Sequence, residues 1–588
     1  MRRRHAVTAF ALGAAVLLGG CASVPESSTP QAIGTIAKEP VVTSVPAPSP
    51  GREPDLLLRD FFGASTDPAG GHTAARQFLT QRASNSWDDA ASTTIVDKVD
   101  VLPESRNGDH ATYTIRANRV GELEPGGVYQ AVEGNFEAKV RLTRVDGQWR
   151  IDELPAGVIL DRPQFLKTYQ RKSLYFLDPS GSTVVPDLRW ITAAQQDMPA
   201  QLIDMLIAGP KQSLAGAVSN PAGRVSVKGP ITKADGRSAG VGVGFGGLRI
   251  DFQGASALDQ ATRDQLAAQV VWTLANAEIS GPYVLLGDGK PLDDRLPNGW
   301  TTADVSSTNP MASAGAAVGL HALANGALVS VTDTGIASMP GFFGTAANIK
   351  TVALSRDGRL AAAVTDTGRS APDAASALMV GPIEGFASPI AEGVTMTRPT
   401  WSVGDNSVWT VMDGSKVIRA ARDAESGQLV NTPVDTAELA SLGANISELR
   451  LSRDGVRAAT IVDGKVYVVT VRHRPDGTYA LGSPRPVANG LGSPAVSLDW
   501  SSGDSIVVAR AASDIPVVTV AVDGSRMDAL PSRNLTPPVT SVDASATTAF
   551  VADTRAVFQL NNNDPAGDRY WREVPGLTGV KAIPVLPG

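Results

Sequence analysis

The C-terminal half of the chain repeats itself, and this repetition limits the possible folds more than any other feature of the sequence. The segment Ala353–Gly358 (Ala-Leu-Ser-Arg-Asp-Gly) recurs as Arg450–Gly455 (Arg-Leu-Ser-Arg-Asp-Gly), and each precedes a strand rich in Ala and Val. Trp401–Asp405 and Trp500–Asp504 also match each other. Copies begin near positions 355, 401, 452, 500 and 543, so the step is 43 to 51 residues. Such a period predicts a β-propeller of about six blades over residues 310–588.

A second unit is expected over residues 171–300. A short strand is followed by a helix that stops at Gly209-Pro210, and a second helix carries Leu266, Val270 and Leu274 one turn apart. Strands at 248–252 and 283–286 complete a β-α-β-α-β order. In this order the chain resembles the GerMN domain, an α/β domain of spore-germination and cell-envelope proteins. The segments that carry the resemblance are Leu174–Val185, Met205–Pro210 and Gly289–Pro291.

Residues 55–165 predict a third domain, of the α+β class. Leu57, Leu58 and Phe61 mark an early helix, whereas Phe136–Thr143 alternates between apolar and polar side chains, as a strand with one solvated face does. Asp146-Gly147 predicts a hairpin turn after that strand. Helices followed by an antiparallel sheet resemble the NTF2-like fold.

The N-terminus has the pattern of an export signal with a lipid-attachment site. Arg2 to Arg4 precede an apolar run that ends in the residues Leu18, Gly19, Gly20 and Cys21. The run is shorter than the roughly 20 residues of a transmembrane helix, so residues 1–20 are expected to be a signal peptide. Leu-Gly-Gly-Cys resembles the lipobox of bacterial lipoproteins, which implies that Cys21 is acylated after cleavage. The alternative is an ordinary secretory signal with an incidental cysteine.

Residues 21–54 then predict a tether. The stretch combines the lipidated N-terminus with seven prolines among Ser, Thr, Ala and Val, and such a composition buries too little apolar surface to fold. The mature protein is therefore expected on the outer face of the cytoplasmic membrane, held by two or more acyl chains.

Composition excludes several classes of function. A net charge of −7 argues against nucleic acid, whose phosphates demand a basic surface. Cys21 is the only cysteine, so its acylation leaves no thiol for a disulfide, a zinc-thiolate site or a nucleophile. The histidines of the mature chain lack metal-ligand spacing, and no Gly-x-Ser-x-Gly elbow is present. We therefore predict no cofactor, no metal and no catalytic residue. These four histidines are His72, His110, His321 and His473.

The order of lipobox, Pro-rich tether, NTF2-like segment, GerMN-like domain and propeller resembles the LpqB family of actinobacterial lipoproteins over essentially the whole mature chain. The resemblance implies a non-enzymatic accessory protein of the cell envelope. It also implies a link to the MtrAB two-component system, through the extracellular domain of its sensor kinase MtrB, and so to cell-wall metabolism and cell division. Only the lipid attachment transfers residue by residue, onto Cys21.

Two hypotheses from other classes remain open at this point. The first is a module that binds peptidoglycan or another glycan in the central channel of the propeller. The second is a cell-wall hydrolase with an unrecognised carboxylate pair, since any two acidic residues can meet in a fold. The adjacent pairs Asp88-Asp89 and Asp293-Asp294 are more simply surface charge.

Overall fold

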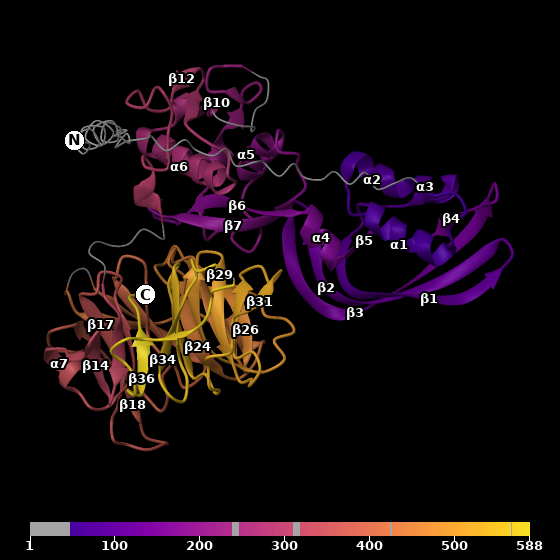
Figure 1. The fold of residues 1–588 in the computed structure, drawn as a ribbon. Helices are drawn as coiled ribbons and strands as arrows, with labels where there is room; N and C mark the ends of the chain where they lie inside the picture. The colour runs from indigo at the N-terminus through magenta and orange to yellow at the C-terminus, as the bar shows by residue number, and fades with distance from the viewer. Residues whose placement is uncertain (1–47, 238–245, 310–317, 424–425, 566) are drawn as a thin grey trace, which may run out of the picture. The chain divides into compact units, whose positions relative to one another are not determined.

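The computed structural model describes residues 48–237, 246–309, 318–423, 426–565 and 567–588, which all belong to one compact unit, Val45–Gly588 (Figure 1). The predicted signal peptide 1–20, the predicted lipobox with Cys21 and nearly all of the predicted 21–54 tether lie outside the described residues. Within the described ranges, no helix is long and apolar enough to cross a membrane.

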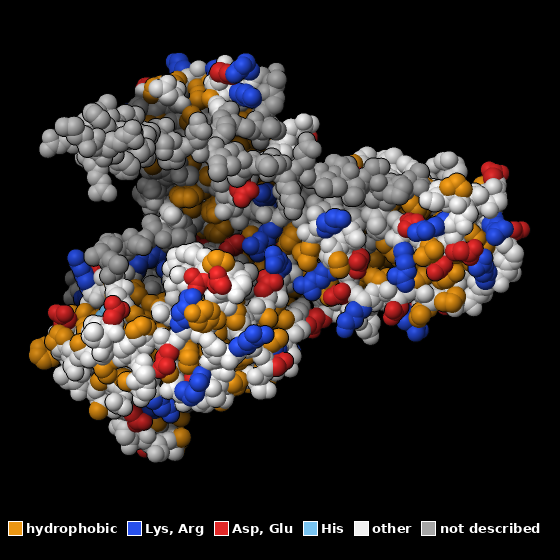
Figure 2. All heavy atoms as spheres, in the orientation of Figure 1, with side chains coloured by type: hydrophobic (Ala, Val, Ile, Leu, Met, Phe, Trp, Pro, Cys, Tyr) orange, Lys and Arg blue, Asp and Glu red, His pale blue; other side chains and the backbone are white. Residues whose placement is uncertain are grey.

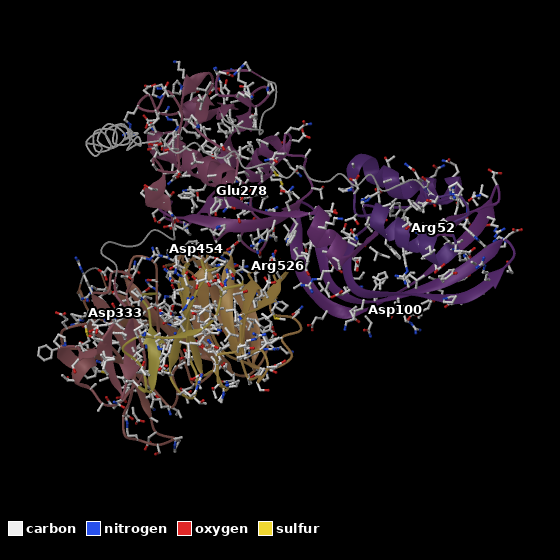
Figure 3. The ribbon with its side chains drawn as sticks, viewed as in Figure 1. Arg52, Asp100, Glu278, Asp333, Asp454 and Arg526 are labelled. Carbon is white, nitrogen blue, oxygen red and sulfur yellow. The ribbon has the colours of Figure 1, made fainter. Side chains whose placement is uncertain are left out.

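The N-terminal domain places three helices before a five-stranded sheet of order β4-β3-β2-β1-β5. Pro54 begins the first helix, which contacts the sheet through the buried side chains Leu57, Leu58 and Phe61. Arg52, labelled in Figure 3, lies just before that helix. It forms an ion pair with Asp60 of the helix. The elements are α1 (Pro54–Ala64), α2 (Ala69–Arg76), α3 (Gln81–Ser86), β1 (Thr93–Asn107), β2 (His110–Glu124), β3 (Val128–Val145), β4 (Gln148–Glu153), β5 (Val158–Asp161) and α4 (Arg162–Thr168).

The hairpin predicted at Asp146-Gly147 is confirmed. It joins β3 to β4, and both residues have positive φ (51° and 77°), the conformation that a two-residue hairpin turn requires. The predicted alternation on β3 also holds, because Val140 and Leu142 are buried whereas Glu137 and Lys139 are exposed. Acidic and basic side chains are interspersed over this domain in Figure 2, in part as cross-strand ion pairs. These pairs are Arg116–Glu137, Lys139–Glu104 and Arg141–Glu153.

The middle domain has two layers around one core. A two-stranded hairpin, β6-β7, lies apart from a sheet of order β12-β11-β10-β8, in which β9 also pairs with β10. Leu266, Val270 and Leu274 of the long helix are fully buried, as predicted. The elements are β6 (Gln170–Leu177), β7 (Val184–Ile191), α5 (Met198–Ala208), η1 (Pro221–Arg224), β8 (Ser226–Val227), β9 (Thr232–Lys233), β10 (Leu248–Gln253), η2 (Ala255–Ala257), α6 (Gln260–Asn276), β11 (Tyr283–Gly287), β12 (Lys290–Pro291) and η3 (Ser306–Thr308).

The C-terminal domain is a β-propeller. Between His321 and Val585 the described chain forms six four-stranded antiparallel sheets, the number of blades expected from the repeat (Figure 1). The first blade consists of β36 (Ala582–Val585), β13 (His321–Ala324), β14 (Ala327–Thr332) and β15 (Gly335–Ser338), followed by α7 (Gly341–Thr345). The second consists of β16 (Ile349–Leu354), β17 (Leu360–Asp366), β18 (Ser376–Pro382) and β19 (Ser388–Gly393), and the third of β20 (Thr400–Trp401), β21 (Ser407–Met412), β22 (Lys416–Arg422) and β23 (Leu429–Pro433), followed by α8 (Ala437–Ala440). The fourth consists of β24 (Ile446–Leu451), β25 (Arg457–Val462), β26 (Lys465–His473) and β27 (Tyr479–Pro486), the fifth of β28 (Ala495–Ser502), β29 (Ser505–Arg510), β30 (Val517–Ala521) and β31 (Met527–Ala529), and the sixth of β32 (Ser541–Ala544), β33 (Thr548–Ala552), β34 (Val557–Asn561) and β35 (Arg572–Glu573).

The geometry of the blades explains the sequence repeat. The Ser-Arg-Asp-Gly segments turn the innermost strand into the second one, with Gly358 and Gly455 at φ 69° and 71°. The recurring tryptophans link neighbouring blades. Trp401 Nε1 donates to the carbonyl of Ala353 (3.2 Å), and Trp500 Nε1 donates to that of Arg450 (2.9 Å). The two acceptors occupy equivalent positions in the repeat, so packing between blades accounts for both tryptophans.

Candidate functional site

The histidines singled out in the sequence lie in four different elements. His72 is in α2 against the Trp87 ring (centroids 5.8 Å apart), and burial lowers the pKa of His72. His321 is in β13, where burial also lowers its pKa; His110 begins β2 and His473 ends β26. The described residues contain no group of three or more His, Cys, Asp or Glu side chains that could hold a metal ion.

The adjacent acidic pairs are held in local contacts. Asp89 forms an ion pair with Arg76 (2.8 Å), and Asp293 forms one with Arg295 (2.5 Å). Asp88 accepts a hydrogen bond from the backbone N–H of Ala90. Asp88 and Asp294 are exposed, as predicted for surface charge, and Asp89 is half-buried, but Asp293 is buried (5% exposed), so that prediction is wrong for Asp293.

A cluster of charged side chains that the sequence patterns did not predict lies at the innermost strands of the propeller. Arg398 lies just before β20 and contacts two acids, Glu448 on β24 (Nη2–Oε1 2.8 Å) and Asp543 on β32 (Nη1–Oδ2 3.4 Å). Arg450 Nε lies 3.1 Å from Asp499 Oδ1 on β28. All five side chains are at most 10% exposed. We call these residues the channel network.

Asp499 and Asp543 interact directly within the channel network. Burial raises the pKa of Asp543, and the charge of Asp499 raises it further, against the attraction of Arg398. Burial opposes ionisation of Asp499 as well, but Arg450 and a hydrogen bond from Asp543 hold its pKa below the usual range. When the pair binds one proton, Asp543 holds it, because its pKa is raised whereas that of Asp499 is lowered.

The channel network bears on both alternative functions. Asp499 Oδ2 accepts from the backbone of Ala544 (2.9 Å), and Asp543 Oδ2 accepts from that of Leu586 (3.0 Å), so the protein itself engages these carboxylates. A hydrolytic pair must instead face a substrate and a water molecule. A glycan in the channel at this level would have to displace the network. The charged residues of the network recur at about the spacing of the blades, in or beside apolar strands. This recurrence is the pattern by which the sequence could have indicated the network.

A second set of contacts joins the three domains. The strand β7 is buried along its whole length, and it contacts β3 of the N-terminal domain. Trp190 of β7 packs against Phe165 of α4 (centroids 4.7 Å apart) and donates its Nε1–H to Asp523 of the propeller (3.0 Å). Arg485 of the propeller donates to the carbonyl of Tyr129 on β3. We call this region around β7 the junction.

Buried charges also hold the junction. Asp187 of β7 is fully buried between Arg189 (Nη2–Oδ2 2.7 Å) and Lys211 (Nζ–Oδ1 3.4 Å). Burial lowers the pKa of Lys211 to about 8, against the opposing effect of Asp187. Arg189 also donates to the carbonyl of Gly126, in the N-terminal domain (2.9 Å). Each charge has a partner, as buried charges require.

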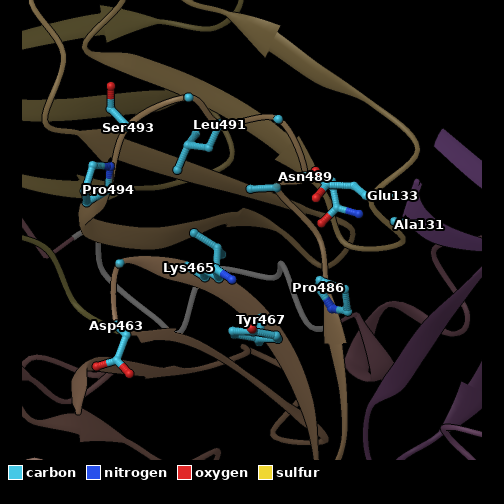
Figure 4. Close-up of a pocket in the computed structure, with 15 residues that line it drawn as sticks. Ala131, Glu133, Asp463, Lys465, Tyr467, Pro486, Asn489, Leu491, Ser493 and Pro494 are labelled. Carbon is cyan, nitrogen blue, oxygen red and sulfur yellow. The ribbon is translucent and has the colours of Figure 1, made fainter. Parts of the chain in front are cut away.

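A pocket of about 580 Å³ opens beside the junction (Figure 4). Ala131 and Glu133 of β3 form one wall, and the propeller forms the rest. Lys465 and Tyr467 of β26 lie opposite the loop that carries Asn489 and Leu491 (Figure 4). The pocket combines two acids (Glu133 and Asp463), an ammonium group and amide donors, which suits a polar partner surface.

Three family models match this chain. One described as the lipoprotein LpqB beta-propeller domain matches residues 326–587, and one described as the lipoprotein LpqB N-terminal domain matches residues 47–166. A third, described as sporulation and spore germination, matches residues 173–293.

Similar proteins extend along the whole chain. Lipoprotein LpqB of Rhodococcus opacus (strain B4) is 66% identical over 100% of this chain and 99% of its own length. The protein of the same name from Nocardia farcinica (strain IFM 10152) is 50% identical over 99% and 98%, and that from Mycobacterium ulcerans (strain Agy99) is 46% identical over 98% and 98%. A periplasmic gluconolactonase of Pseudomonas aeruginosa matches 44% of this chain and 79% of that chain with 16% identity and a TM-score of 0.31, which is too low to support an argument.

Proposed function

The chain belongs to the LpqB family of lipoproteins, and from this premise we propose that it is an accessory protein that binds the extracellular domain of a membrane sensor kinase. The proposed partner is an MtrB-like sensor, and the proposed effect is modulation of an MtrAB-like two-component system. Cell-wall metabolism and cell division would then respond to this contact. We propose no catalytic turnover for the chain itself.

The proposed anchor is Cys21, at the end of the lipobox. Acyl chains on this residue would hold the mature protein on the outer face of the cytoplasmic membrane, and the Pro-rich stretch 21–54 would set its reach. Two proteins on one membrane have a raised effective concentration, so a weak contact suffices for regulation.

The junction is the observation that supports this proposal best. Hydrogen bonds such as Trp190–Asp523 and Arg485–Tyr129 cross domain boundaries, so the domains present a preformed common surface. A preformed surface loses little conformational entropy when a partner binds, which favours recognition. The pocket with Lys465 and Glu133 lies on that surface.

The test is a binding measurement between the purified chain and the purified extracellular domain of the sensor kinase. We expect a saturable complex, and crosslinking of the same pair in intact cells. The sensor domain of an unrelated two-component system serves as the control and should not bind. Absence of a complex, together with unchanged kinase output after deletion of the gene, would overturn the proposal.

Two matched substitutions locate the contact. Lys465 and Lys416 are exposed residues that begin the third strands of neighbouring blades, β26 and β22. Lys465→Glu reverses a charge in the pocket of Figure 4, whereas Lys416→Glu does so away from it. Weaker binding of the Lys465→Glu protein alone would assign the contact to the junction pocket.

A further inference from the structure

We propose that a cavity between the third and fourth blades binds a small organic anion, and that Arg419 recognises its carboxylate or phosphate group. The cavity has a volume of about 360 Å³ and lies beside the turn that carries Asp454, at one end of the propeller (Figure 3). Trp409, Arg419 and Tyr479 line it from β21, β22 and β27. The loop Asp178–Ser180 of the middle domain lines another side.

Arg419 is held in place by an aromatic ring. Its guanidinium carbon lies 4.7 Å from the centroid of Tyr479, and that ring packs edge-on against Trp409 (5.4 Å, 83°). The ring of His473 lies 4.8 Å from the same Tyr479 ring. A cation over an aromatic face is stabilised by about 0.5–2 kcal/mol, and the planar fork of N–H donors is then fixed in direction.

Among the described residues, no hydrogen bond from the side chain of Arg419 is found. Its Nε is buried and has no hydrogen-bond partner among the described residues. No ion pair to Arg419 occurs within the described ranges either. The guanidinium therefore has bonding capacity that the protein does not use, and a carboxylate or phosphate in the cavity would form charge-assisted hydrogen bonds with it.

The acidic residues of the cavity are already engaged. Asp178 accepts hydrogen bonds from the backbone N–H groups of Ser180 (3.0 Å), Ser182 (2.8 Å) and Thr183 (2.7 Å). Asp454 forms an ion pair with Arg457 (2.7 Å). Neither carboxylate contacts Arg419, so the cation is open to an outside anion.

The remaining walls define the rest of the ligand. Pro179, Val456 and Val471 are apolar, whereas Ser407 and Asn406 add an hydroxyl and an amide. A cavity of this size accommodates a molecule of about the size of an amino acid or a monosaccharide. The ligand class is therefore a small molecule with one oxyanion for Arg419, an apolar part and few further polar groups.

Calorimetric titration of the full chain with two probes tests this inference. Inorganic phosphate represents a phosphate source, and N-acetylalanine represents a carboxylate with a small apolar part. We expect saturable binding of at least one probe. Arg419→Gln, which removes the charge and the fork, should weaken that binding by about tenfold or more, and Arg419→Lys, which keeps only the charge, should weaken it less.

Arg572 provides a matched control. Its guanidinium carbon lies 4.2 Å from the Tyr570 centroid in the sixth blade, but it forms an ion pair with Asp564 (2.6 Å). Arg572→Gln should therefore leave probe binding unchanged.

The outcomes separate clearly. Binding of phosphate alone or of N-acetylalanine alone identifies the source of the anion and supports the site. Failure of both probes to bind overturns it, and so does equal binding by wild-type and Arg419→Gln proteins with the same thermal unfolding temperature. If the Gln variant does not fold, undiminished binding by a folded Arg419→Lys protein also overturns it. None of these results depends on the sensor kinase, so they are distinct from the test of the proposed function.

Discussion

Buried ion pairs link the innermost strands at the centre of the propeller. Arg398 contacts Glu448 of the fourth blade and Asp543 of the sixth, and it also donates to the carbonyl of Leu498 (3.1 Å). The sequence contains these residues at the blade spacing, yet no sequence pattern shows that their side chains meet. Their pairing depends on ring closure, which brings together residues up to 145 positions apart.

Substitution of Arg398 tests this role. Arg398→Met should lower the free energy of unfolding by about 3–5 kcal/mol, because it leaves the buried carboxylate of Glu448 without its cation. Urea unfolding of the propeller provides the measurement. Arg359→Met is the matched control: Arg359 is 86% exposed and 3.7 Å from Asp357, so its loss should change stability by less than about 1 kcal/mol. Equal effects of the two substitutions would contradict the assigned role.

The proton held by Asp543 in the channel network predicts a pH dependence. The folded-state pKa of Asp543 is raised, so above the usual carboxyl pKa of about 3.9 the folded state holds a proton that the unfolded state has lost. Stability contributed by this group is therefore complete at low pH and falls as pH rises toward the raised pKa. Asp543→Asn keeps a hydrogen-bond donor to Asp499 and removes the titration.

We therefore expect the stability of the Asp543→Asn protein, relative to wild type, to rise between pH 5 and pH 8. Urea midpoints at several pH values across this interval measure the difference. Asp357→Asn is the control, since Asp357 lies at a partly exposed turn and its pKa is lowered, chiefly by the backbone N–H of Arg359. A pH-independent difference for Asp543→Asn would show that Asp543 does not hold this proton.

At the scale of elements, β7 shows where sequence patterns fail. Its sequence, Val-Val-Pro-Asp-Leu-Arg-Trp-Ile, interrupts apolar residues with a proline and two charges, so it was not predicted as a strand. In the structure Asp187 and Arg189 pair with each other, and their other partners, Lys211 and Gly126, are distant in sequence. By contrast, the hairpin at Asp146-Gly147 and the apolar face of α6 depend on local rules, and both were predictable.

Substitution of two tryptophans tests how much the contacts of β7 stabilise the junction. Trp190 and Trp149 are each 4% exposed, but the Nε1–H of Trp190 donates to Asp523, whereas that of Trp149 has no partner among the described residues. Substitution by Phe removes the indole N–H at either position and reduces the side-chain volume by the same amount. Trp190→Phe should cost about 1–3 kcal/mol more than Trp149→Phe, because only the first leaves a buried carboxylate short of a donor.

Hydrogen exchange along β7 and near Asp523 gives the local readout. Faster exchange is expected in the Trp190→Phe protein and not in the Trp149→Phe protein. Similar exchange in both would mean that the bond to Asp523 contributes nothing to the junction.

At the scale of the whole molecule, the proposed lipid anchor should determine where the protein is held without affecting how its domains fold. All described elements lie between residues 48 and 588, C-terminal to Cys21 in the sequence. Cys21→Ala should therefore leave the circular dichroism spectrum and the unfolding midpoint unchanged while it abolishes incorporation of labelled acyl chains. Ser27→Ala, in the same stretch, is the control and should retain the label. Acylation of the Cys21→Ala protein would contradict the assignment of the anchor.

The pairing of β36 with β13 determines the order in which the propeller can close. Ala582–Val585 completes the blade that starts at His321, more than 250 residues earlier. Because synthesis runs from the N-terminus, His321–Ala324 are exposed long before their partner strand is made. For that interval the first sheet has an open edge, which neighbouring chains can pair with. Closure of the propeller therefore requires its final strand. A chain truncated before residue 582 would leave the edge of β13 unpaired and would be prone to aggregate.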